Sequence, residues 1–195
     1  MTSGWVADEE AAGAWITGQL SATFAALDLP LLARFFEAWG EESAADAASL
    51  DAWSAFLRAS RPTAELQTED RHLGGALARV LDGLGLAEAR PWIVRTDVSY
   101  AAMFALAARR WNVPLTAALH GFAFAWAEAQ TSAAVRLVPL GQSAGQRVLT
   151  AAAAAIPDAV SRALVLPDDE LGAAAPRLAI ASAQHETQYS RLFRS

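Results

Sequence analysis

The sequence predicts an all-α protein, a single-domain bundle of about eight to ten helices over residues 1–184, followed by a C-terminal segment at 185–195. Three observations support this. Apolar residues recur at intervals of three and four through most of the 195 residues. Prolines and glycines separate many of the apolar stretches. No alternating apolar and polar run reaches useful strand length, and the nearest apolar case in the last third, 164–166, has only three residues.

The expected helices span, in order, 8–27, 31–39, 43–58, 61–84, 92–110, 114–138, 142–155, 157–166 and the chain from 176 onwards. The first begins with three acidic residues, which the positive end of the helix dipole favours. Asp28 is a possible N-cap for the second helix, and Gly40 ends it. Pro62, Pro114 and Pro157 each suit the first turn of a helix, where the missing N–H costs nothing.

The stretch 126–149 joins a largely apolar segment to a proline and two glycines, Pro139, Gly141 and Gly145. Pro139 cannot donate to the carbonyl four residues back, and it biases Val138 away from helical geometry. We therefore expect a helix to end near Val138 and another to begin near Gln142. Small residues around this break let another backbone approach closely, which is typical of a docking or passage site. The candidate partner-binding residues here are Arg136, Gly141, Gln142 and Gln146.

The same stretch contains the pattern G-x-S-x-G, at residues 141–145, which marks the nucleophile elbow of α/β-hydrolases. Asp168 or Asp169, and then His185, follow Ser143 in the order that this fold uses. A serine hydrolase that uses Ser143 is therefore the alternative function. The elbow needs a parallel sheet beneath it, and the helical pattern does not predict one.

Composition excludes several other classes of protein. A net charge of −6 argues against nucleic-acid binding, and the absence of cysteine excludes disulfides and thiolate metal sites. No signal peptide opens the chain, so a cytoplasmic protein is expected. The uncharged run 111–127 contains Asn112, Pro114 and His120, which makes it a poor membrane span.

The sequence predicts neither a tightly bound metal nor another cofactor. None of the three histidines has a second histidine or a cysteine at ligand spacing. No P-loop motif is present. His185 and Glu186 offer at most a weak site for a borderline divalent ion.

The C-terminal segment has the composition of an interface. Tyrosine, leucine, phenylalanine and two arginines are concentrated in it. Two hypotheses therefore remain for this segment: a tail that becomes ordered when it binds a partner, or a frayed end of the chain. The candidate partner-binding residues are His185, Glu186, Thr187, Gln188, Tyr189, Ser190, Arg191, Leu192, Phe193 and Arg194.

Five blocks resemble the urease accessory protein family UreF, and the likeness extends over essentially the whole chain. They are Gly4-Trp5-Val6, Asp28-Leu29-Pro30-Leu31, Glu65-Leu66 with Glu69, the run from Val135 to Gln142, and Ala179-Ile180-Ala181-Ser182 leading into the tail. The tail is the most specific of these blocks. Members of the family usually carry a further segment before the Gly-Trp-Val position, whereas this sequence begins at Met1-Thr2-Ser3. The resemblance implies that this segment forms a first helix in the family, so we expect the surface against which that helix packs to be exposed here.

The resemblance implies an all-α homodimer that acts as a nickel-insertion chaperone and not as an enzyme. Such proteins bridge UreD, also called UreH, and the GTPase UreG, and the assembly docks on apo-urease. The family's C-terminal segment helps to recruit UreG, which assigns that role to Tyr189–Arg194 here. Nickel would be handled by the complex. A direct nickel carrier that uses His185 is the third hypothesis.

Overall fold

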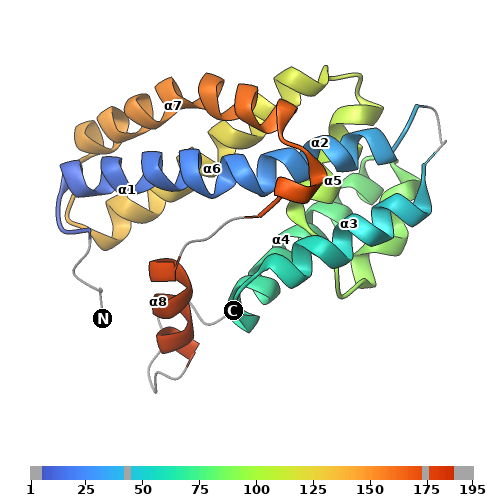
Figure 1. Ribbon diagram of the computed structural model, residues 1–195, viewed down its shortest axis with the longest axis horizontal. Helices are drawn as coiled ribbons and strands as arrows, with labels where there is room; N and C mark the ends of the chain where they lie inside the picture. Colours follow the sequence, from blue (N-terminus) through green and yellow to red (C-terminus); the bar gives the residue numbers. More distant parts are fainter. Residues whose placement is uncertain (1–5, 42–44, 173–175, 187–195) are drawn as a thin grey trace.

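The computed structural model describes residues 6–41, 45–172 and 176–186, and all regular structure in these ranges is helical (Figure 1). The elements are α1 (Glu9–Ala22), η1 (Phe24–Ala26), α2 (Asp28–Ala38), α3 (Ala47–Ser60), α4 (Ala64–Gly83), η2 (Ala87–Val94), α5 (Tyr100–Arg110), α6 (Leu115–Leu137), α7 (Gln142–Val165), η3 (Asp168–Glu170) and α8 (Pro176–Glu186), where η denotes a short 3₁₀ helix. These eight α-helices confirm the predicted all-α class.

Polar side chains at the helix N-termini explain several of the boundaries. Asp8, Asp46, Thr63 and Ser99 each accept a hydrogen bond from the backbone N–H three residues further on, at 2.8–3.3 Å. Each bond satisfies an N–H that has no partner inside its helix. The prediction that Asp28 is an N-cap is wrong. Because η1 runs almost directly into α2, Asp28 is already helical and its carboxylate is free to bind elsewhere.

Several predicted boundaries differ from the structure, and two of these differences have a clear physical reason. The helix expected over 92–110 is divided into η2 and α5, because the chain turns at Thr96 and Asp97 and Ser99 then caps a new helix. The break expected at Pro157 is absent, and α7 continues to Val165. Ile156 and Val160 on either side of Pro157 are buried in the core. Continued burial of this helix face outweighs the cost of about 3 kcal/mol for an interior proline.

The main core surrounds α2, which packs against α3, α5 and α6. Leu31, Leu32 and Phe35 are inaccessible to solvent, as are Met103 and Leu106 on α5. Aromatic rings extend this core, since Phe24 stacks on both Phe122 and Trp126 with centroids 5.2 and 4.9 Å apart. A smaller cluster lies where α1, α6 and α7 run side by side (Figure 1), and its buried members are Ala12, Ile16, Ala127, Val148 and Ala152.

A largely buried ion cluster joins four helices. Arg61, at the end of α3, pairs with Asp28 of α2 at 2.6 Å and with Asp70 of α4 at 3.0 Å. Asp70 also accepts from the backbone N–H of Tyr100, the first residue of α5. Burial raises the pKa of Asp70, with Arg61 acting in the opposite direction. Burial disfavours charge on Arg61 too, but the two carboxylates outweigh it and raise the pKa of Arg61.

Two helical stretches, Glu9–Ala38 and Gln142–Val165, are long and apolar enough to cross a bilayer by length and composition. Core helices of soluble proteins meet the same criterion, and most of the apolar part of Glu9–Ala38 is buried inside the bundle.

Candidate partner-binding site

The helix break predicted around Pro139 forms the turn of a hairpin. α6 ends at Leu137, and Val138 is extended, with φ −109° and ψ 138°. Gly141, with φ −72° and ψ 161°, is the N-cap of α7, which begins at Gln142. The prediction of a break between Val138 and Gln142 is therefore confirmed, and α6 and α7 run back along each other from this turn (Figure 1).

A groove of about 290 Å³ lies between the two helices near this turn. Its lining residues are Glu128, Thr131, Ser132, Val135 and Arg136 on α6, with Gln142, Gly145, Gln146 and Leu149 on α7. A Cβ placed on Gly145 would lie 2.7 Å from Cγ2 of Val135, so the two helices lie close together there. Glycine at this position permits that approach.

Three of the four residues predicted in this stretch, Arg136, Gln142 and Gln146, meet in the groove. The fourth, Gly141, is exposed at the turn and does not line it. The remaining lining residues were not predicted. The signal was present, because 128, 131, 132 and 135 share one helical face and 142, 145, 146 and 149 share another. Only the pairing of α6 with α7 shows that these two faces meet.

Polar groups at the rim of the groove are available to another molecule. Among the residues that the structure describes, the side chains of Arg136, Gln142 and Gln146 form no hydrogen bond or ion pair. Glu128 accepts a long bond, 3.5 Å, from the hydroxyl of Ser132. Thr131, at the floor, donates instead to the carbonyl of Ala127 at 2.8 Å and is 6% exposed. The hydroxyl of Thr131 at the floor therefore has its hydrogen-bond partner within the protein, whereas the side chains of Arg136, Gln142 and Gln146 at the rim do not.

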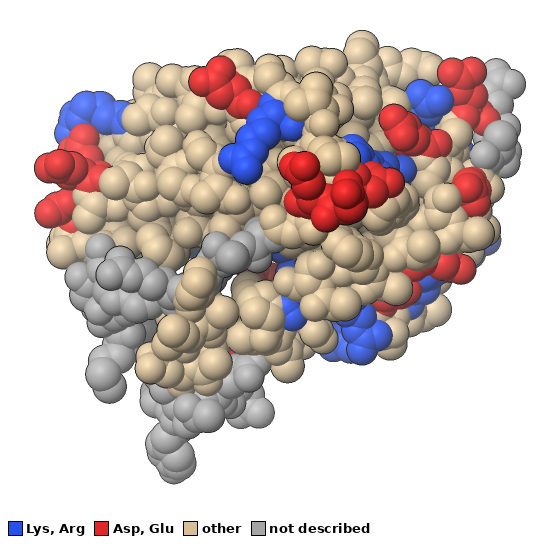
Figure 2. All heavy atoms as spheres, viewed as in Figure 1, with Lys and Arg blue, Asp and Glu red and all other residues tan. Residues whose placement is uncertain are grey.

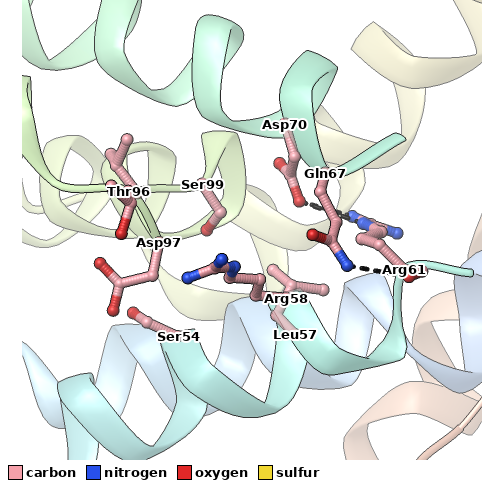
Figure 3. A pocket seen from close by; sticks show the side chains of 10 residues that line it. Ser54, Leu57, Arg58, Arg61, Gln67, Asp70, Thr96, Asp97 and Ser99 are labelled. Atoms are coloured by element: carbon pink, nitrogen blue, oxygen red, sulfur yellow. Dashed lines mark hydrogen bonds and ion pairs between the residues drawn. The ribbon is translucent and has the colours of Figure 1, made fainter. Parts of the chain in front are cut away.

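A second hollow, between α3, α4 and the segment before α5, is too small for a ligand (Figure 3). Its volume is about 10 Å³, which is room for one water molecule. Arg61 and Gln67 lie together on one side of it, and Ser54 and Asp97 lie on the other (Figure 3). Asp97 is tied to Arg95 at 2.8 Å, and this bond lowers the pKa of Asp97. The hollow belongs to the packing of the bundle.

The geometry does not support the serine-hydrolase alternative. Ser143 is exposed in the first turn of α7, and no strand precedes it in the described chain. Asp168 forms an ion pair with Arg34 at 2.8 Å, and the side chain of His185 lies outside the described residues. Within the described ranges, no group of three or more histidine, aspartate or glutamate side chains is placed to hold a metal ion.

The predicted C-terminal site falls mostly outside the described residues. Thr187–Ser195 are not described, and His185 and Glu186 are described only as the last turn of α8. Described residues before this segment are bonded to the rest of the bundle. Arg34 donates to the carbonyl of Leu166 at 2.5 Å, and the hydroxyls of Thr63 and Ser182 are 2.7 Å apart, which places α8 beside the start of α4 (Figure 1).

Charge is mixed on the face shown in Figure 2, where acidic and basic groups lie among broad neutral areas. This face has no continuous basic region of the kind that nucleic acids bind. Neutral areas between scattered charges are compatible with protein partners.

The sequence matches the model of the UreF family over residues 6–153. It is 47% identical over 193 residues to a urease accessory protein UreF of Alkalilimnicola ehrlichii, covering 99% of this chain and 83% of that one. The proteins of the same name from Pseudomonas putida strain W619 and Chromohalobacter salexigens are 45% and 46% identical, with coverage of 99% and 98% of this chain and 85% and 82% of theirs. The predicted family is thereby confirmed, and this chain belongs to the UreF family of urease accessory proteins.

Proposed function

We propose that this protein is a cytoplasmic, non-catalytic adaptor that bridges UreD and the GTPase UreG while nickel is delivered to apo-urease. The observation that carries the proposal is the likeness over nearly the whole chain to proteins called urease accessory protein UreF. The open rim of the α6–α7 groove supports it, because the side chains of Arg136, Gln142 and Gln146 have no partner among the described residues.

Two regions provide the contacts in this proposal. The first is the groove, with Arg136, Gln142 and Gln146 at its rim. The second is the segment 185–195, which begins in the last turn of α8 and recruits UreG. The protein works as a homodimer. Nickel is cargo of the whole complex, and this chain holds no metal tightly.

Deletion of residues 185–195 tests the adaptor role. The chain, UreD and UreG are co-expressed, and the complex is captured through a tag on UreD. We expect the full chain to retain UreG and the shortened chain 1–184 to lose most of it while still binding UreD. Substitution of Arg71, an exposed arginine on α4, by alanine is the control and should change nothing.

Equal recovery of UreG with the full and the shortened chain would remove the role of the tail. Recovery of UreG on UreD without any copy of this chain would remove the bridging role itself.

A further inference from the structure

We propose that the α6–α7 groove binds an extended peptide segment of a partner protein, about five residues long, with a basic side chain at its Glu128 end and an acidic one at its Arg136 end. The inference rests on the proposed adaptor function and specifies the chemistry of one contact. It follows from the shape of the groove, from the spacing of its two glutamines and from the placement of its two charges.

The walls of the groove set the size of the occupant. The close approach of Gly145 to Val135 forms a floor, and Leu149 adds apolar surface to it. A volume of about 290 Å³ is close to the lower limit of typical ligand sites, so it holds a few side chains and not a folded element. Apolar floor and polar rim together suit a peptide that buries alternate side chains while its main chain stays near the rim.

The glutamine spacing matches an extended backbone. Gln142 and Gln146 are four residues apart on α7, which places them about 6 Å apart along the helix axis. Peptide groups on one side of an extended strand repeat every two residues, at about 6.6–6.8 Å. Each side-chain amide offers a donor and an acceptor to a peptide group. A helical ligand would satisfy its own peptide groups and leave these amides unused.

The two charges give the occupant a direction. Glu128 and Arg136 are eight residues apart on α6, or about 12 Å along its axis. Four residues of extended chain cover about 13 Å. Because α6 and α7 run in opposite directions, Gln142 lies at the Arg136 end of the groove and Leu149 at the Glu128 end. A segment with a cation and an anion about four residues apart therefore pairs with both ends and spans both glutamines.

Site-specific photo-crosslinking identifies the occupant directly. Benzoylphenylalanine replaces Ser132 at the rim of the groove, and in a control it replaces Thr150, which is exposed one turn beyond Gln146 and does not line the groove. Each chain is co-expressed with UreD and UreG, and the crosslinked peptide is sequenced. We expect position 132 alone to capture one partner segment, with a basic and an acidic residue about four positions apart. Capture of an amphipathic helix, or no capture at 132, would overturn the proposal.

Substitutions measure what each feature contributes. We expect Arg136→Glu, Glu128→Lys and the pair Gln142→Ala with Gln146→Ala each to weaken partner binding about tenfold. The controls Arg71→Glu and Thr150→Ala should leave it unchanged, and all variants should keep the wild-type melting temperature, since these side chains are exposed.

The outcome separates this inference from the proposed function. If the four groove substitutions leave partner binding unchanged while deletion of 185–195 abolishes UreG recruitment, the groove proposal fails and the adaptor function stands. If UreG binds UreD equally well without this chain, the adaptor function fails.

Discussion

Two adjacent glycines in α4 give a sharp test of how the bundle packs. A Cβ on Gly74 would lie 2.6–2.8 Å from three backbone atoms of Ser99, whereas a Cβ on Gly75 would meet the carbonyl oxygen of Ile93 at 3.6 Å, an ordinary contact. Both glycines are buried inside the same helix. They therefore differ mainly in the space available for a methyl group.

The expected effects of alanine have opposite signs. Alanine inside a helix is favoured over glycine by about 1 kcal/mol. At Gly74 the methyl group meets the main chain, and Ser99 is fixed because its hydroxyl caps α5 through Ala102 at 3.1 Å. Overpacking costs about 1–3 kcal/mol, and a main-chain contact belongs at the upper end of this range. We expect Gly74→Ala to lose about 2 kcal/mol of unfolding free energy and Gly75→Ala to gain about 0.5–1 kcal/mol.

Urea denaturation followed by far-UV circular dichroism measures both variants against the wild type. For a chain of this size, the expected changes correspond to a melting temperature lower by about 6 °C for Gly74→Ala and higher by about 2 °C for Gly75→Ala. A Gly74→Ala protein as stable as the wild type would show that α4 does not lie against the start of α5 as described.

Three further predictions follow from contacts elsewhere in the bundle. Arg61→Met leaves two largely buried carboxylates without their cation and should lower the unfolding free energy by about 3 kcal/mol. The control Arg90→Met removes an exposed pair with Asp82 and should change the unfolding free energy by less than about 0.5 kcal/mol. Equal losses for the two variants in chemical denaturation would contradict this prediction. In Gly145→Ala the new methyl group meets Val135, whose side chain strongly prefers one rotamer in a helix, and the unfolding free energy should fall by about 1 kcal/mol. Gly18→Ala has open space around it and should raise the unfolding free energy by about 0.5–1 kcal/mol. Thermal melting measures both changes. Arg95 and Arg110 hold the pKa values of Asp97 and Glu88 below their ordinary 3.8 and 4.5. The stability that these carboxylates contribute is therefore complete above that range and is lost as the pH falls through their lower folded values. Denaturation from pH 6 to pH 2 should show that Asp97→Asn loses less unfolding free energy on acidification than the wild type.

Local signals in the sequence predicted much of the fold. The break at Pro139 was predictable because a proline and the residue before it are restricted whatever surrounds them. Gly40 was predicted to end α2, which ends at Ala38, and Gly40 adopts a φ of 58° that favours glycine. Pro157 was misinterpreted because its effect depends on burial of Ile156 and Val160, which is a tertiary property.

The candidate site was only partly predictable for the same reason. Arg136, Gln142 and Gln146 were found from their position around the break. Glu128 and Leu149 lie two turns or more away from it, and they join the site only because α6 packs against α7. Arg61 was not singled out, since its partners Asp28 and Asp70 are 33 and 9 residues away in the chain. Contacts of this kind are set by the tertiary arrangement.

The nickel content of urease purified from cells that lack this chain shows whether the chain is an adaptor in urease maturation. We expect nickel-poor urease without the chain, and full nickel loading when either the wild-type chain or Ser143→Ala is restored. Urease that is fully loaded without the chain, or a folded Ser143→Ala chain that restores no nickel, would contradict a non-catalytic adaptor in urease maturation.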